Sequence, residues 1–309
     1  MIKFLFSLFK SQSNSTRPVD ERLKRLINMP PPSSKLYLND IDSSRPEHIT
    51  LNSTHSSPDF DINSSAVFAT KEQHEALKNY FRLKGVSVQF NYESVNMTGF
   101  FDEAAEVLIH NAQLMDKIVG QIRWAYRKSV NNIKIVLDNY SKPEQKQIRQ
   151  ILEKLYKYTV FARYSFDKTN NVVWLSRQES KTVEQFFRGD YLEWFVLSRV
   201  LKFAKKHKIA LSISRNALIK LQNHKKYELD VAFICENRQP VFIECKSGNY
   251  RTDFGKYQEI RKQFNLPEEN VILLNLETTQ SEENALTMMH HITVCSVESL
   301  EEHLSKVML

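Results

Sequence analysis

The sequence predicts a mixed α/β fold with two domains. Residues 86–90 alternate between apolar and polar side chains like a β-strand, 241–246 is a short, mostly apolar run next to turn residues, and amphipathic helical stretches separate such runs. The chain has 309 residues, of which 41% are hydrophobic and 26% are charged, so two folded cores are feasible. No run of about 18 apolar residues occurs, and no membrane-spanning helix or stable membrane insertion is expected.

The first 65 residues are predicted to form a disordered arm or linker. Residues 11–65 contain six of the nine prolines and few apolar residues. The segment 1–10 is apolar but lacks the long apolar core and cleavage site of a signal peptide. We interpret it as a helical end that docks on its own domain or on a partner; a membrane contact is the alternative.

Strands and helices alternate between residues 66 and 180, which predicts a smaller Rossmann-like α/β domain with a regulatory or targeting role. Gly85 is typical of a residue that ends a helix, and Pro143 is typical of a residue in the first turn of a helix. The expected elements are a strand at 66–69, a helix at 71–84, a strand at 86–90, a long helix at 102–128, a strand at 133–137, a helix at 141–156, and strands at 159–164 and 172–175.

Residues 181–309 predict a mixed sheet flanked by helices. The two strands on either side of 236–240 are predicted to form a hairpin. The expected elements are a helix at 190–207, a strand at 210–213, strands at 227–235 and 241–246, a helix at 251–264, a strand at 271–276, and helices at 283–290 and 298–307.

Composition narrows the classes of function. Three cysteines are too few for a disulfide framework or for a four-cysteine metal site, which favours a reducing compartment, the cytoplasm. The net charge of +7 favours an anionic partner. The chain contains 6 glycines and neither G-x-G-x-x-G nor G-x-x-x-x-G-K-[ST], so ordinary dinucleotide and P-loop nucleotide sites are not expected.

Two carboxylates are predicted to face each other across the hairpin. If the hairpin is symmetrical about Asn237, Asp230 lies opposite Glu244, with Cβ atoms roughly 4.5–5.5 Å apart. The period of a strand puts Lys246 on the same face as Glu244 and Cys245 on the other face. Both strands are otherwise apolar, so we expect them to be central and these charges to be partly buried.

Facing carboxylates repel each other unless a cation lies between them. Mg²⁺ or Mn²⁺ suits the hard oxygen ligands of Asp230 and Glu244, and the backbone carbonyl of Cys245 is a further candidate ligand. Such a metal generates hydroxide and neutralises charge on a phosphate, while Lys246 orients the attacking water or stabilises the transition state. The alternative is a salt-bridged pair of strands without chemistry.

Glu193 has two interpretations. It stands three residues after Asp190, which is the spacing of a helix capping box. It also falls in the middle of the apolar arc of the 190–207 helix, where an inward carboxylate needs a partner. We favour a metal- or water-positioning role, and plain capping is the alternative.

Together these residues resemble the PD-(D/E)XK nuclease superfamily over roughly residues 185–280. The resemblance is carried by Glu193, by Glu228-Leu229-Asp230 and by Ile243-Glu244-Cys245-Lys246-Ser247-Gly248. The proline of the signature is absent, since Leu229 precedes Asp230. The resemblance implies a restriction-endonuclease-like αβββαβ core and metal-dependent phosphodiester cleavage. The catalytic residues that it implies are Glu193, Asp230, Glu244 and Lys246.

The chain is most similar in this superfamily to CRISPR-associated ancillary nucleases that join a CARF-type sensor to a PD-(D/E)XK domain. The segments 189–193 and 228–231 resemble their nuclease signatures. The Thr-Gly-Gly-Thr-Lys loop with which such sensors often bind cyclic oligoadenylate is absent, and Leu137-Asp138-Asn139-Tyr140 stands at the equivalent strand end. A small-molecule activator of the N-terminal domain is therefore left open.

Basic residues support a nucleic-acid substrate. Residues 201–227 contain eight Lys or Arg and no Asp or Glu, and further basic residues follow the motif. A solvated basic face is the alternative. The residues to which we assign phosphate contacts are Lys205, Lys206, Lys225, Lys226, Arg251 and Lys256.

The sequence thus predicts a cytoplasmic nuclease that depends on Mg²⁺ or Mn²⁺ and cleaves nucleic acid, DNA rather than RNA. A homodimer is left open. The alternative function is that of a non-catalytic nucleic-acid-binding or scaffold protein with a nuclease-like fold. The presence of Asp230, Glu244 and Lys246 together argues against this alternative.

Overall fold

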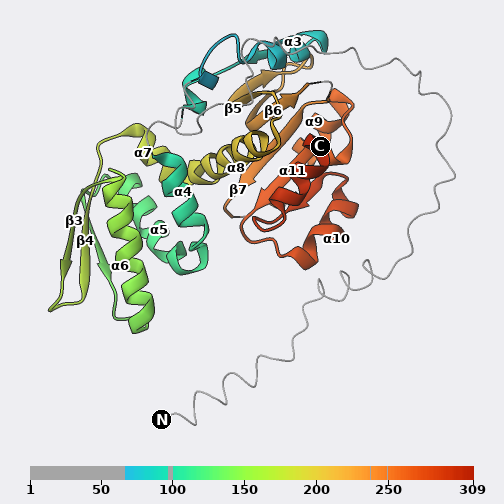
Figure 1. The fold of residues 1–309 in the computed structure, drawn as a ribbon. Helices are drawn as coiled ribbons and strands as arrows, with labels where there is room; N and C mark the ends of the chain where they lie inside the picture. Colours follow the sequence, from blue (N-terminus) through green and yellow to red (C-terminus); the bar gives the residue numbers. More distant parts are fainter. Residues whose placement is uncertain (1–66, 97–99, 237, 249) are drawn as a thin grey trace.

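The computed structural model describes residues 67–96, 100–236, 238–248 and 250–309. The arm predicted at 1–65, with its docking segment at 1–10, lies outside these residues. Figure 1 shows two layered units, one built on a six-stranded sheet and one on a three-stranded sheet, each packed against helices. The mixed α/β class is confirmed.

The larger sheet is mixed and has the strand order β1-β5-β6-β7-β8-β9. β5, β6 and β7 are antiparallel neighbours, whereas β8 and β9 run parallel to β7. The parallel pairs follow from the helical connections after β7 and β8, since parallel strands need a long crossover. The strands are β1 (Ser87–Gln89), β5 (Leu211–Lys220), β6 (Lys226–Cys235), β7 (Val241–Lys246), β8 (Val271–Asn275) and β9 (Thr293–Cys295).

Helices cover both faces of this sheet. Val231 and Phe233 of β6 pack in one core cluster with α8 (Tyr191–His207) and α11 (Leu300–Met308). Ala232 and Ile234 pack in another with α3 (Glu75–Leu83) and α9 (Phe254–Phe264), as the alternation of a strand requires. The order α8-β5-β6-β7-α9-β8 is the one that the resemblance implied, and α10 (Gln280–His290) precedes β9. No helix in the described part of the chain combines the length and apolarity needed to cross a membrane.

The smaller sheet has the order β2-β4-β3 and is antiparallel throughout. Residues 168–171 join β3 directly to β4, and a link this short permits only an antiparallel pair. The Rossmann-like description, which requires parallel neighbours, is therefore wrong for these strands. The elements of this unit are α5 (Ala112–Arg127), β2 (Asn132–Val136), α6 (Lys142–Lys157), β3 (Phe161–Asp167) and β4 (Val172–Arg177).

The long helix predicted at 102–128 is two helices, α4 (Phe101–Ile109) and α5. The chain leaves the helical conformation at Asn111, whose side-chain amide donates to the Val107 carbonyl at 2.7 Å. Asn competes with the backbone for hydrogen bonds in this way and favours helix ends. The helical spacing of apolar residues continues through the break, so periodicity alone predicts one helix.

Residues 67–95 belong with the larger sheet. β1 pairs with β5, and α3 contributes Leu77 and Phe81 to the core beneath that sheet, although we had grouped this stretch with the 66–180 domain. The strand predicted at 66–69 is also wrong in its described part, because Val67 and Phe68 lie in a 3₁₀ turn with Phe68 anchored in the core. The roles assigned to the ranges 1–65, 66–180 and 181–309 stay predictions.

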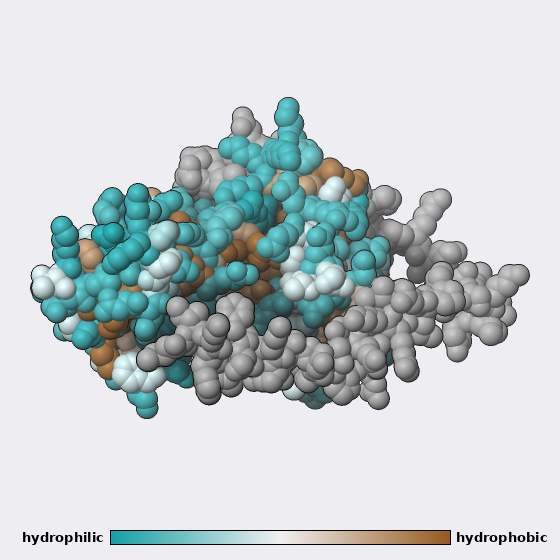
Figure 2. Space-filling view, turned by 90° about the horizontal axis from the view of Figure 1, so that it is seen from below, coloured by the Kyte–Doolittle hydropathy of each residue, from teal (hydrophilic) through white to brown (hydrophobic). Residues whose placement is uncertain are grey.

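The two units share one hydrophobic core. Leu108 of α4 and Ile148 of α6 belong to the same buried cluster as Leu197 of α8 and Ile243 of β7. In Figure 2, the view from below Figure 1, hydrophobic residues gather in the middle of the face between two flanks that are mostly hydrophilic. α7 (Lys181–Gln185) and an irregular helical turn, Phe186–Asp190, lead from the smaller sheet into α8.

Candidate active site

The candidate site lies where β6 and β7 separate, in the middle of the larger sheet. The pairs Val231↔Ile243 and Phe233↔Val241 have the register predicted from a hairpin centred on residue 237. Asp230 and Glu244 are the next residues along the two strands. The backbone N–H of Cys245 donates to Oδ2 of Asp230 at 2.8 Å, so the aspartate side chain occupies a position in the sheet's hydrogen bonding.

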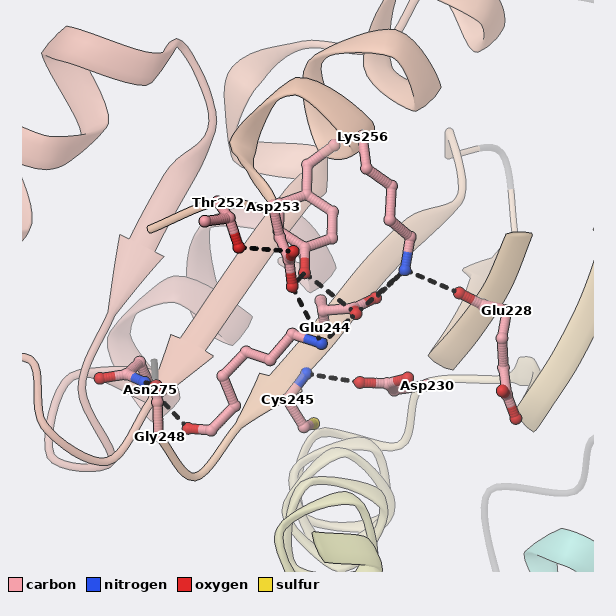
Figure 3. Close-up of polar contacts among 11 residues, drawn as sticks. Glu228, Asp230, Glu244, Cys245, Gly248, Thr252, Asp253, Lys256 and Asn275 are labelled. Carbon is pink, nitrogen blue, oxygen red and sulfur yellow. Dashed lines mark hydrogen bonds and ion pairs between the residues drawn. The ribbon is translucent and has the colours of Figure 1, made fainter. Parts of the chain in front are cut away.

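Glu244 is almost fully buried and has two cations beside it (Figure 3). Its Oε1 lies 3.0 Å from Nζ of Lys246 and 3.1 Å from Nζ of Lys256, which comes from α9. The hydroxyl of Tyr257 donates to the same oxygen at 3.0 Å. Burial together with Glu244 raises the pKa of Tyr257 well above its ordinary value, so this hydroxyl keeps its proton.

The two lysines also reach neighbouring groups. Lys246 lies 3.4 Å from the carboxylate of Asp253, just before α9, and Lys256 donates to the Glu228 carbonyl at 3.4 Å. Burial alone would lower the pKa of Lys246, but the charge and hydrogen bond of Glu244, together with the charges of Asp230 and Asp253, outweigh burial and the pKa is raised. Lys246 is therefore a cation at neutral pH.

Asp230 is held in a setting that disfavours its charge. Burial first, and then the Glu244 carboxylate, raise its pKa from 3.8 to about 7. The hydrogen bond from Cys245 and the ammonium groups of Lys246 and Lys256 act in the opposite direction. A further positive charge beside Asp230 would therefore stabilise its ionised form.

Glu193 points into the site from α8 and does not cap the helix. No side chain caps this helix end, and Oε2 of Glu193 accepts a hydrogen bond from Nη1 of Arg215 at 2.8 Å. Burial and then Asp230 raise the pKa of Glu193 to about 9, against the effect of Arg215. Glu193 and Asp230 are therefore electrostatic neighbours, as the positioning interpretation requires, and the capping alternative is not observed.

Arg215 is a site residue that the sequence analysis counted only as part of a basic run. It is 5% exposed, its Nε donates to the Ser94 carbonyl at 2.8 Å, and its guanidinium lies 4.1 Å from the ring centre of Trp194. Nη1 also lies 3.4 Å from Asp190. The available signal was a lone Arg in an apolar strand, since a buried cation needs partners.

Asn216, the next residue of β5, marks a kink opposite Asp230. Its φ of 56° is left-handed, a conformation that Asn tolerates better than most residues. Residues before it, such as Ile213, pack in the α8 cluster, and residues after it, such as Ala217, pack in the α9 cluster. Its amide oxygen is buried and has no hydrogen-bond partner among the described residues.

The basic residues assigned to phosphate contact fall in different places. Lys256 touches a candidate catalytic residue, since it contacts Glu244. Lys226 is exposed on β6, Lys225 lies 2.8 Å from Glu259, and the Arg251 guanidinium lies 5.3 Å from the Tyr250 ring centre.

Lys205 and Lys206 lie in the last turn of α8, whereas Glu193 lies in the first. Twelve residues of helix separate Lys205 from Glu193, which is about 18 Å along the axis. Lys206 also pairs with Glu301 at 3.2 Å. Proximity in sequence therefore does not bring these two lysines beside the carboxylates.

The donor set fits a hard divalent ion bound mainly by water and substrate. Asp230, Glu244 and the Cys245 carbonyl would hold it, and the raised pKa of Asp230 indicates uncompensated negative charge. No group of three or more His, Cys, Asp or Glu side chains in the described residues has the arrangement of a metal site. Mg²⁺ usually keeps several waters and takes one or two protein carboxylates plus substrate phosphate.

Comparisons with known proteins bear on the fold. No protein-family model matches the chain, and no curated protein matches it. Protein VC1899 from Vibrio cholerae is similar in structure, with a TM-score of 0.54 and 16% identity. Can2 from Sulfobacillus thermosulfidooxidans, solved in complex with cyclic tetra-adenylate, is similar with a TM-score of 0.52 and 16% identity. Each match covers 75% of this chain and 60% of the other, so this chain shares a fold with part of both proteins.

Proposed function

We propose that the protein is a metal-dependent nuclease of the PD-(D/E)XK type. The observation that carries the proposal is the placement of Asp230 and Glu244 at the ends of adjacent central strands, with Lys246 beside Glu244. Glu193 approaches the same place from α8. The fold shared with Can2 supports a CRISPR-associated relative.

In this proposal each side chain has a separate task. A bound Mg²⁺ or Mn²⁺ would supply hydroxide and neutralise charge on the phosphate. Asp230 and Glu244 provide the oxygen ligands, and Lys246 donates hydrogen bonds where negative charge builds on the phosphate. Glu193, held by the hydrogen bond from Nη1 of Arg215, would position the attacking water.

The regulatory half of the proposal is that the N-terminal part controls or targets cleavage. Can2 was solved with cyclic tetra-adenylate, and we extend to this chain the possibility of a small-molecule activator. DNA as the preferred substrate, a homodimer and a cytoplasmic location belong to the same proposal.

One observation favours the non-catalytic alternative. Glu244 already has Lys246, Lys256 and Tyr257 as partners, so its burial does not require a metal. A nucleic-acid-binding protein with this fold would keep such a salt-bridged cluster for stability. The two functions differ in whether phosphodiester bonds are cleaved.

The deciding experiment is a cleavage assay on single- and double-stranded DNA and RNA. It is run with Mg²⁺, Mn²⁺ or chelator, and with and without cyclic tetra-adenylate. We expect metal-dependent cleavage that Asp230→Asn and Glu244→Gln abolish, because each removes a ligand charge at nearly constant volume. Glu259→Gln changes a carboxylate that is 30% exposed and paired with Lys225; this variant is the matched control and should cleave normally.

Calorimetric titration with Mn²⁺ separates metal binding from turnover. Both site variants should lose Mn²⁺ affinity while their circular dichroism spectra stay native. Unchanged Mn²⁺ affinity in both, or no cleavage of any substrate by the wild type in either metal, with or without cyclic tetra-adenylate, would overturn the proposal.

A further inference from the structure

A cavity of about 260 Å³ lies between α5 and the ends of β7 and β8. Its size is slightly below the usual range for ligand pockets, which begins at about 300 Å³, so it suits one base rather than an oligonucleotide. Apolar side chains form part of its wall, among them Met115 and Val119. The groups in its lining that matter for recognition are Asp116, Gly120, Arg123, Tyr191, Ser247 and Glu277.

The cavity is next to the candidate active site. Ser247 follows Lys246 directly, and Tyr191 stands two residues before Glu193 on α8. Burial raises the pKa of the Tyr191 hydroxyl, against the effect of the neighbouring Ser247 and Arg123 side chains, so this hydroxyl is neutral. A second cavity of about 550 Å³ lies alongside, but its lining includes none of these residues. Ser247 thus joins the cavity to the strand end that carries Lys246.

Gly120 keeps the cavity open. It lies in the interior of α5, where a glycine is unfavourable relative to alanine. A Cβ built on Gly120 meets no atom within 4 Å, so no packing contact in the described residues explains the missing side chain. The empty space in front of this helix position is instead part of the cavity. Gly120 is exposed and lines the cavity, so a larger side chain at this position would take up part of that space.

The charges of the lining select the kind of ligand. Asp116 and Glu277 are exposed carboxylates, and Arg123 is the only cation among the described residues of the lining. Arg123 is held by a bond from its Nε to the Phe187 carbonyl at 3.1 Å. Two carboxylates against one guanidinium disfavour a phosphate inside the cavity. They favour hydrogen-bond donors, such as the amino groups of bases. The phosphate of the bound strand would instead lie outside the cavity and contact Lys246 and Lys256.

We infer that this cavity takes one unpaired base carrying an amino group, adenine, cytosine or guanine, from the strand bound at Lys246. The inference rests on the proposed nuclease function for the position of that strand. The base packs on the apolar wall and its amino group donates to Asp116 or Glu277. The site therefore requires a single-stranded or locally opened substrate and discriminates against thymine and uracil.

The test measures base capture without catalysis. Full-length protein in chelator is titrated into single-stranded DNA with one 2-aminopurine among adenines, whose fluorescence rises when the base leaves the stack. We expect a rise with wild-type protein. Gly120→Leu fills the cavity with a good helix former, so the rise should vanish and affinity should fall about tenfold, the scale of losing one stacked base. Gln121→Leu, an exposed neighbour outside the lining, is the matched control and should bind normally.

Competition tests the base preference. Oligo-dA and oligo-dC should displace the probe several-fold better than oligo-dT, and Asp116→Asn with Glu277→Gln should remove that difference. An unchanged fluorescence rise in Gly120→Leu, or no rise in the wild type, overturns the inference. The cleavage assay is read separately: cleavage without base capture leaves the nuclease function standing, whereas capture without cleavage leaves this cavity standing as a base site.

Discussion

The backbone N–H of Cys245 donates to the Asp230 carboxylate at 2.8 Å, across the point where β6 and β7 separate. This bond fixes Asp230 beside the strand that carries Glu244. It does not remove the repulsion between the two carboxylates, since Glu244 still raises the pKa of Asp230. The geometry of the site is thus set by the backbone while its charge remains incompletely balanced.

The metal-free protein should lose stability as pH rises from 5 to 9. Asp230 and Glu193 have folded pKa values of about 7 and about 9, above their ordinary values of 3.8 and 4.5. The unfolded chain releases these protons first, so the folded state binds more protons in this window and the free energy of unfolding falls. The scale is about 1.4 kcal/mol per pKa unit, and the two shifts do not add in full because Glu193 and Asp230 titrate as interacting neighbours.

Thermal melts across this pH range check the expectation. Glu193→Gln should flatten the curve because it removes the group with the higher pKa, whereas the control Glu259→Gln should not. Saturating Mn²⁺ should also flatten it. A melting temperature of the wild type that is constant from pH 5 to 9 would contradict the assigned shifts.

Lys246 and Lys256 both contact Glu244, yet we expect different defects. Lys246→Ala should lower single-turnover cleavage by roughly a hundredfold or more, the scale of losing one preorganised donor, with little change in metal or substrate affinity. Lys256→Ala should mainly weaken nucleic-acid binding. Lys246 pairs with Glu244 and Asp253 in the structure. Near-normal cleavage by a destabilised Lys246→Ala protein would remove Lys246 from the mechanism.

The six assigned basic residues should differ in their effect on salt dependence. Lys226 is exposed four residues before Asp230, so Lys226→Ala should reduce the slope of log affinity against log salt by roughly 0.9 for one lost duplex contact. The double variant Lys205→Ala, Lys206→Ala lies at the far end of α8 and should leave the slope unchanged. Filter binding at several salt concentrations measures both. Equal loss of slope in the two variants would mean that position relative to the carboxylates is irrelevant.

Local patterns were sufficient for much of the fold and for the centre of the site. Apolar runs on either side of the turn at 236–240 predicted β6 and β7, and the symmetry of the hairpin predicted the register that brings Asp230 next to Glu244. The start of α6 was also predictable, because Ser141 and Glu144 form a capping box. These features depend on residues close in sequence, whose relative positions strand or helix geometry dictates.

Only the tertiary structure decided which distant segments meet. The pairing of β1 with β5, the insertion of β4 between β2 and β3, and the ion pair of Arg215 with Glu193 join residues that no local period relates. The same holds for Lys256 at Glu244, which needs α9 to pack over β7. Non-local contacts form because they bury apolar surface and pair buried charges. A single sequence is compatible with many arrangements of distant segments that would bury apolar surface and pair charges. It does not identify the one arrangement in which all these contacts form together.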